Sequence, residues 1–230
     1  MKNLKKGFTL AEVLITLGII GVISALTLPM FTVNAKYQAL ASKISSTLSS
    51  VENGFAAMMS ADSADDMTET NYWRNNKSTG ELAAFLKVEE VSAPYASCET
   101  LSGTTINLSP NKTYLMKNGA VIMIKYKEAS LTEAQRLAKG ASVAQFLAQI
   151  DIDVNGSEKP NKYGRDVFRF GLGSNGHLYP CGSLNYSLLT NGDNSLYWKT
   201  TTENDAKCND TNKSVACTAR LIEENFKINF

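Results

Sequence analysis

The chain has 230 residues, 43% of them hydrophobic, which is enough for one ordinary hydrophobic core and an appendage. Its 23 basic and 22 acidic residues leave a formal net charge of +1, so the charge balance predicts no nucleic-acid partner. His177 is the only histidine, which excludes a histidine cluster, and no serine or carboxylate has a neighbouring base in the sequence. We therefore expect no enzymatic activity.

The N-terminal segment has the features of a membrane anchor. Lys2, Lys5 and Lys6 precede the first acidic residue, Glu12, and residues 13–31 contain no charge. At about 1.5 Å per residue, this uncharged run forms a helix of roughly 28 Å, close to the hydrocarbon thickness of a bilayer. A basic flank stays in the cytoplasm, so the chain after Phe31 should lie outside. A cleaved secretory signal would instead end in a small-residue site, to which residues 25–29 are a poor match.

Residues 5–15 read Lys-Lys-Gly-Phe-Thr-Leu-Ala-Glu-Val-Leu-Ile. This segment resembles the processing site of the type IV pilin and type II secretion pseudopilin superfamily. The resemblance implies that prepilin peptidase cuts between Gly7 and Phe8 on the cytoplasmic face and then methylates the new amino group of Phe8. A simple signal anchor is the alternative.

An ionised carboxylate within a bilayer costs several kcal/mol unless it is paired, so Glu12 is a candidate functional residue. The resemblance implies that Glu12 neutralises the amino terminus of a neighbouring subunit during assembly. In a low dielectric the two charges attract strongly, whereas either alone is penalised. The alternative is that Glu12 lies near the membrane interface and stays hydrated.

Beyond the apolar run, hydrophobic residues recur every three or four positions from Val33 to Met58, which predicts that the helix continues as an amphipathic half. Pro29 should kink this helix, because it removes a backbone donor and crowds the preceding turn. A further short helix is expected over residues 80–87, with Thr79 as its cap, and another over residues 130–139.

Two β-hairpins are predicted around Asn118-Gly119 and around Asn175-Gly176. Residues 145–153 are ambiguous between helix and strand, although Ile150, Ile152 and Val154 alternate in favour of a strand. Residues 216–230 alternate in a way that is compatible with a strand. The expected fold is therefore α+β and pilin-like: a long N-terminal helix, membrane-spanning in its first half and amphipathic in its second, packed on a small antiparallel β-sheet.

The segment from Asp151 to Asp166 contains alternating oxygen side chains followed by a glycine, as in the first half of a calcium loop. The full EF-hand pattern is missing, because Lys162 stands where its last acidic ligand would be. The same residue types also form ordinary turns. The candidate calcium ligands are Asp151, Asp153, Asn155, Asn161 and Asp166.

All four cysteines follow the apolar run, where an oxidising compartment would favour two disulfides. Of the three possible connectivities, we expect Cys208 to pair with Cys217 and Cys98 with Cys181, since this closes one short loop and ties a distant one to the sheet. Zinc binding is the alternative, but no two cysteines have the close spacing of a zinc knuckle.

We expect a leader at residues 1–7, a transmembrane and assembly helix at 8–31, and a head at 32–230 that includes the amphipathic half of the helix. The resemblance implies a structural subunit of the bacterial inner membrane, with a cytoplasmic N-terminus and an extracytoplasmic head, that assembles into a type IV pilus or type II secretion pseudopilus. Its partners would be copies of itself or other pilins, prepilin peptidase, the inner-membrane assembly machinery and membrane lipid. The alternatives are a membrane-tethered binding module or adhesin that does not polymerise, and a minor or tip subunit.

Overall fold

The computed structural model describes residues 7, 9–77, 79–100, 102–127, 144–182 and 217–223. Two compact units are present, Met1–Ala39 and Leu40–Phe230. The first consists mainly of the N-terminal part of helix α1 (Leu10–Ala61), which has 52 residues and continues without a break past Pro29. The helix therefore does not end at the proline. The kink in its axis that we expect there stays a prediction.

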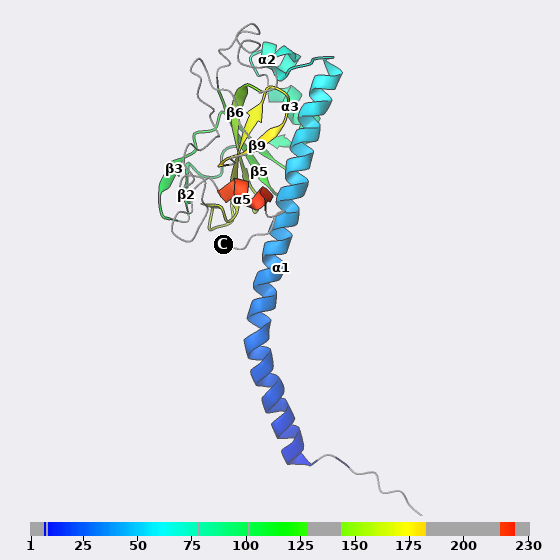
Figure 1. Cartoon of the computed structure of the whole chain (residues 1–230), viewed down its shortest axis with the longest axis vertical. Coiled ribbons are helices and arrows are strands. Elements are labelled where there is room, and N and C mark those ends of the chain that lie inside the picture. The colour runs from blue at the N-terminus through cyan, green and yellow to red at the C-terminus, as the bar shows by residue number, and fades with distance from the viewer. Residues whose placement is uncertain are drawn as a thin grey trace, which may run out of the picture. The chain divides into compact units, whose positions relative to one another are not determined.

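In the second unit, the last part of α1 has one face against the sheet (Figure 1). Four of its apolar side chains are almost fully buried, Ile44, Val51, Phe55 and Met58, as the predicted stripe requires. Side chains from α1 also bond to the hairpins: Asn118 donates to the Thr47 hydroxyl at 2.9 Å, and the Leu178 N–H donates to the Glu52 carboxylate at 3.0 Å. The amphipathic half of the helix is therefore confirmed for this part of α1.

Four short helical elements complete the helical part of the described residues: η1 (Met67–Glu69), α2 (Asn71–Arg74), α3 (Thr79–Leu86) and α5 (Cys217–Glu223). Helix α3 confirms the prediction for residues 80–87. It can approach α1 because position 54 is glycine, where an added Cβ would lie 2.3 Å from a methyl carbon of Leu86. The strand interpretation of the C-terminal stretch is wrong for Cys217–Glu223, and the helix expected at 130–139 lies outside the described residues.

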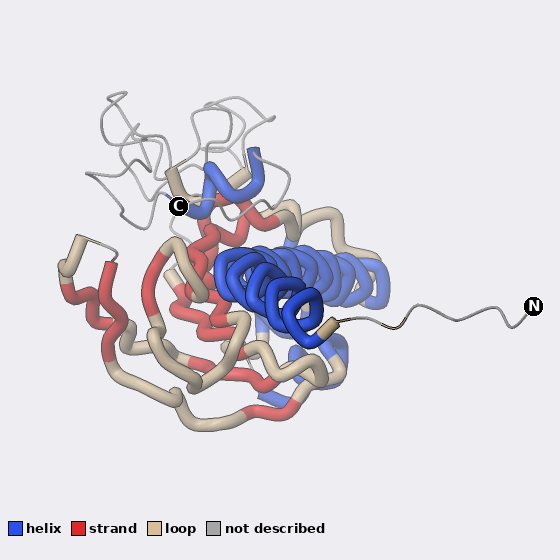
Figure 2. The backbone as a smooth tube through the Cα atoms, turned by 90° about the horizontal axis from the view of Figure 1, so that it is seen from below, coloured by secondary structure: helices blue, strands red, loops and turns tan. Residues whose placement is uncertain are grey.

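The strands in the described part of the chain form one nine-stranded sheet. The strands are β1 (Glu89–Glu90), β2 (Ser97–Thr100), β3 (Thr105–Asn107), β4 (Lys112–Leu115), β5 (Val121–Tyr126), β6 (Phe146–Asp153), β7 (Lys162–Tyr163), β8 (Val167–Gly173) and β9 (Leu178–Pro180). Their order is β1-β4-β5-β6-β8-β7-β2-β3, with β9 paired to β8. Figure 2 shows the strands curving round one side of α1, which is seen nearly end-on there.

The α+β class with a long N-terminal helix is confirmed, but the sheet differs from the small antiparallel one expected. Strand β7 pairs in parallel with both β2 and β8, so the sheet is mixed. The reason is that β7 belongs to the connection between β6 and β8. This connection crosses to the side of β8 opposite β6 and pairs there, parallel to β8, instead of forming a direct turn. Both predicted hairpins form, as β4–β5 and β8–β9, with left-handed Gly119 and Gly176 in their turns.

Strand β6 resolves the ambiguity at residues 145–153. It lies at the centre of the sheet between β5 and β8, and all eight of its residues are buried. Residues 149–153 alternate between polar and apolar side chains, which favours a strand, but both faces of β6 are covered. Three charged or amide side chains, Gln149, Asp151 and Asp153, are thereby buried on this strand.

Candidate functional site: an N-terminal assembly segment and an oxygen-rich loop

The first turn of α1 is organised by Thr9 and Glu12. The Thr9 carbonyl accepts from the Val13 N–H at 3.2 Å, so Thr9 is the N-cap residue. Its hydroxyl accepts from the Glu12 N–H at 3.3 Å, while the Glu12 carboxylate accepts from the Thr9 N–H at 2.8 Å and the Thr9 hydroxyl at 2.9 Å. This reciprocal arrangement is a capping box.

The capping box gives Glu12 an intramolecular role that we did not predict. The signal is in the sequence, as Thr9-x-x-Glu12, directly before the apolar run. Gly7 lies outside the helix and is exposed, while Phe8 lies outside the described residues. In the sequence, Glu12 lies five residues after Gly7, close to the predicted cleavage site.

The apolar part of α1 can cross a membrane by length and composition. Among the described residues it contains one suitable stretch, Leu10–Thr27, with a mean hydropathy of 2.2 and no buried residue. The hydroxyls of Thr16 and Thr27 donate within the helix, to the carbonyls of Val13 at 3.0 Å and Ile23 at 2.9 Å. These polar groups therefore need no water or partner inside a bilayer.

The segment from Asp151 to Asp166 occupies the end of β6, the following loop and β7. Asp153 is fully buried, and its carboxylate accepts from the Tyr95 hydroxyl at 2.6 Å and the Asn155 N–H at 3.1 Å. Burial raises the pKa of Asp153 to about 7, although the hydrogen bond from Tyr95 opposes this shift. The nearby carboxylate of Asp166 contributes to the same rise in the pKa.

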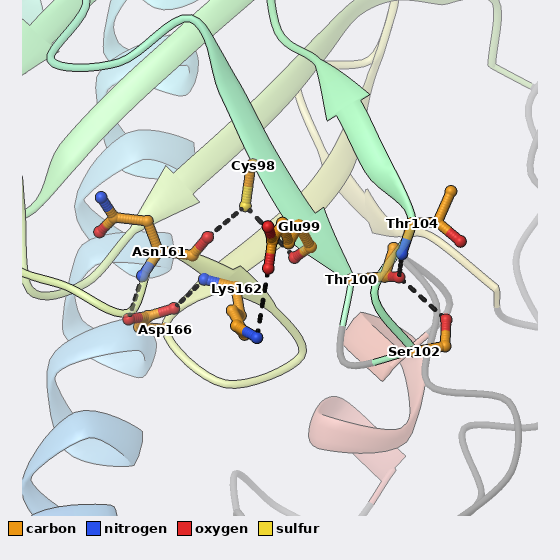
Figure 3. A network of polar contacts seen from close by, with 8 residues as sticks. All are labelled: Cys98, Glu99, Thr100, Ser102, Thr104, Asn161, Lys162 and Asp166. Carbon is orange, nitrogen blue, oxygen red and sulfur yellow. Dashed lines mark hydrogen bonds and ion pairs between the residues drawn. The ribbon is translucent and has the colours of Figure 1, made fainter.

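Asp166 is also buried, and it is held by the start of β7. It accepts from the backbone N–H groups of Asn161 at 3.0 Å and Lys162 at 2.6 Å (Figure 3), and from the side-chain amide of Asn155 at 3.3 Å. Burial raises the pKa of Asp166, while these hydrogen bonds lower it. Asn155 thus contacts both carboxylates, and the loop brings four of the five predicted ligands together.

Asp151 is the exception. It lies directly opposite Arg169 in the β6–β8 pairing and accepts from the guanidinium at 2.7 and 3.1 Å, and from the Gln149 amide at 2.8 Å. This buried, bidentate pair accounts for both carboxylate oxygens. Burial alone would lower the pKa of Arg169, but Asp151 raises it. Asp151 thus has a partner other than the loop, and its inclusion among the calcium ligands stays a prediction.

The carboxamide oxygens of Asn155 and Asn161 are both buried and accept no hydrogen bond. An acceptor left in this way costs about 1–3 kcal/mol, and oxygen ligands of this type are those that calcium prefers. Within the described residues no group of three acidic, histidine or cysteine side chains is placed to hold a metal. A cation here would therefore need both carboxamides beside Asp153 and Asp166, and the donor set fits calcium better than zinc.

The cysteines only partly follow the prediction. Cys217, in α5, is disulfide-bonded, and its expected partner Cys208 lies outside the described residues. Cys98 and Cys181 are free and buried, so the predicted bond between them is wrong. The sheet separates them: Cys98 lies on β2, two strands away from β8, and packs with Tyr163, whereas Cys181 follows β9 and packs with Phe146.

Burial raises the pKa of Cys98 to about 12, which keeps it a thiol. The Cys98 sulfur donates to the Asn161 carbonyl at 2.9 Å (Figure 3) and so helps to fix the start of β7. Next to it, Lys162 forms an ion pair with Glu99 at 3.3 Å. Strand β2 therefore supports the loop that holds Asp166.

Comparison with known proteins bears on the N-terminal segment alone. Residues 2–28 match the model of the prokaryotic N-terminal methylation motif. No curated protein and no solved structure shows significant similarity to the chain. The matched range includes Gly7, Phe8, the capping box and the whole apolar stretch Leu10–Thr27. The chain thus carries the prokaryotic N-terminal methylation motif, in agreement with its resemblance to the type IV pilin and pseudopilin superfamily.

Proposed function

We propose that this chain is a pilin-like structural subunit that prepilin peptidase processes and that assembles into a type IV pilus or type II secretion pseudopilus. One observation carries the proposal: the methylation motif, residues 2–28, includes the first turn of a 52-residue helix, and Glu12 lies in that turn, at the start of an exposed apolar stretch. A static anchor needs neither a carboxylate there nor a glycine–phenylalanine processing site.

The physical argument concerns what covers the apolar stretch. Ten large hydrophobic side chains between Leu10 and Leu26 are exposed in the single chain, and a bilayer or a bundle of neighbouring helices would remove them from water. In the bilayer the head lies on the outer side of the inner membrane; in the filament these helices form the central bundle. The proposed role is structural and not enzymatic.

The proposal is tested by intact-mass and N-terminal peptide analysis of the protein from its native host. The expected product begins at Phe8 and carries one methyl group on its amino nitrogen. An uncleaved Met1 end, or a cleavage near Pro29, would contradict it. Filaments isolated from the cell surface should contain the processed chain.

We also propose that Asp153, Asn155, Asn161 and Asp166 hold a calcium ion in the head. Two buried carboxylates and two unbonded carboxamide oxygens within one loop support this assignment. Backbone carbonyls or water would complete a coordination of about six to eight oxygens. Bound calcium would offset the repulsion between Asp153 and Asp166 and fix the path of the chain between β6 and β8.

A further inference from the structure

A cavity of about 400 Å³ opens at the edge of the head where α2, β4 and β5 meet. Its volume lies in the range of sites for small ligands, about 300–1,000 Å³. Neither the proposed filament role nor the oxygen-rich loop uses it. Six residues line this cavity: Asn76, Lys77, Asn111, Lys112, Tyr126 and Lys127.

Among the described residues, the lining contains three ammonium groups and no carboxylate. Lys112 forms an ion pair at 3.1 Å with Glu90 on the neighbouring strand β1. In the described part of the chain, neither Lys77 nor Lys127 has a carboxylate within 4.0 Å. Within the described part of the head, the cavity therefore has about two uncompensated positive charges, which repel each other unless an anion lies between them.

Lys77 is held in place by its backbone and by two aromatic rings. Asn76 and Lys77 are consecutive residues with φ of 56° and 62°, a left-handed conformation that is costly for residues other than glycine. The Lys77 N–H donates to the Tyr72 carbonyl at 2.8 Å. The Lys77 ammonium then lies 4.9 Å from the centre of the Trp73 ring and 5.7 Å from that of Tyr126. The strained turn thus directs a cation to a defined place beside the cavity.

The available polar groups of the cavity are chiefly hydrogen-bond donors. The side-chain oxygen of Asn111 accepts from the Tyr126 N–H at 2.9 Å, which leaves its amide group free to donate. The Tyr126 hydroxyl is engaged with that of Tyr72. Lysine and amide donors suit an oxyanion, whereas a cation or an apolar ligand would find no matching partner among them.

The number and type of these charged groups further restrict the class of ligand that the cavity can bind. Ammonium groups are point charges without the planar fork of arginine, so they impose no planar geometry, and two of them favour a doubly charged oxyanion over a monoanionic carboxylate. A phosphomonoester carries a charge of about −1.5 to −2 at pH 7, which matches the two uncompensated ammoniums. Lys77 covers the rings of Trp73 and Tyr126, so stacking of a nucleic-acid base on them is disfavoured.

We propose that this cavity binds a phosphate dianion, either inorganic phosphate or the terminal phosphate of a phosphomonoester, through Lys77, Lys127 and the Asn111 amide. Lys112 contributes from the rim, where Glu90 partly neutralises it. The site is separate from the assembly helix, and it gives the head of the subunit a ligand of its own.

The test uses the full-length processed protein in a neutral detergent. Inorganic phosphate and glycerol 3-phosphate are titrated at low ionic strength, with dimethyl phosphate, a monoanionic diester, as the matched comparison. Micelles containing phosphatidic acid provide the same group on a lipid, and so distinguish a soluble source from a headgroup. Binding is followed by calorimetry and by tryptophan fluorescence, because a phosphate that draws the Lys77 ammonium away should alter the emission of Trp73. The Trp73→Phe variant separates this signal from that of Trp198.

We expect saturable binding of one dianion per chain, at least about tenfold weaker for the diester and weakened by added salt. Lys127→Gln and Lys77→Gln should each weaken binding about tenfold or more, since each removes one charge-assisted hydrogen bond. Lys125→Gln is the matched control, because Lys125 lies two residues before Lys127, on β5 and outside the lining, so this variant should bind phosphate as the unaltered protein does. Absence of phosphate binding, or equal loss in Lys125→Gln and Lys127→Gln, would overturn the proposal, and both outcomes are independent of whether the chain forms filaments.

Discussion

Thr9 and Glu12 satisfy each other at the start of α1: the Glu12 carboxylate accepts two hydrogen bonds from Thr9, and the Thr9 hydroxyl accepts one from the Glu12 N–H. In a single subunit the Glu12 carboxylate therefore has hydrogen-bond partners, which we did not predict from the sequence. Assembly would add a stronger one, the positively charged amino group of a neighbouring Phe8. A carboxylate has room for both, because two oxygens offer about four lone-pair sites.

We predict that Glu12 and Thr9 variants separate the cap from the assembly contact. Thr9→Val removes the hydroxyl cap, at a cost of about 0.5–2 kcal/mol to the helix end, but keeps the carboxylate, so filaments should still form. Glu12→Ala removes the charge that pairs with the amine, and should leave processed protein in the membrane with little in filaments. Fractionation of membrane and sheared filaments, with immunoblotting, measures both.

Glu12→Gln is the informative intermediate, because its amide oxygen can still accept from Thr9 while the charge is lost. We expect it to assemble as poorly as Glu12→Ala. Normal filaments from Glu12→Gln would mean that the cap is the essential feature, and that no ion pair with the amino terminus is needed.

The contact between α1 and α3 predicts that alanine substitutions at Gly54 and at Gly80 change the stability of the protein differently. Gly54→Ala places a Cβ within 2.3 Å of a Leu86 methyl carbon, and repacking that side chain should lower the free energy of unfolding by about 1–3 kcal/mol. Gly80→Ala, on α3, meets nothing within 4 Å and should be neutral or stabilising by up to about 1 kcal/mol. Urea unfolding followed by near-UV circular dichroism measures the two variants. Equal stability of both would show that Leu86 repacks without cost.

The cysteine states predict a labelling pattern. In denaturant without a reductant, Cys98 and Cys181 should react with a maleimide, whereas Cys217 should react only after reduction. In the folded protein the first two should react slowly, because both are buried and burial raises their pKa values. Peptide mapping identifies the labelled residues. Protection of Cys98 and Cys181 in denaturant would restore the bond predicted from sequence.

The comparison of sequence and structure shows which features local patterns can predict. The apolar stripe ending at Met58, the short helix α3 and the Asn-Gly turns depend on residues close together in the chain, and each formed where expected. The capping box was equally local and was overlooked. Strand β6 was ambiguous because its first residues, 146–148, are an apolar run that suits a helix or a strand, and only residues 149–153 alternate between polar and apolar side chains.

Features that depend on strand order were beyond the sequence. Asp151 pairs with Arg169 because the register of β6 and β8 places them opposite each other, and no spacing in the chain predicts that register. The same holds for Tyr95, 58 residues from the Asp153 that it contacts. The predicted bond between Cys98 and Cys181 was wrong for this reason as well, since it required a neighbourhood of strands that the mixed sheet does not provide.

The oxygen-rich loop makes the calcium proposal testable by thermal unfolding of the full-length protein in detergent. At a hundredfold excess over the dissociation constant, calcium should stabilise the head by about 2.7 kcal/mol, and thus raise Tm by about 5–10 °C over the value in chelator. Asp166→Asn and Asp153→Asn remove a ligand charge and should abolish most of this difference. Near-UV circular dichroism reports the melting of the head.

Asp151→Asn is the matched control, because Asp151 lies on the same strand as Asp153 and is as deeply buried but is bound to Arg169. Breaking that pair leaves a buried guanidinium without its counter-charge, so Tm should fall in calcium and in chelator alike. The difference between the two conditions should then remain as in the unaltered protein. If Asp151→Asn removed the calcium effect and Asp153→Asn did not, the ligands would be those on the Arg169 side of the strand. If calcium changed no melting temperature, the loop would be a turn stabilised by its own hydrogen bonds.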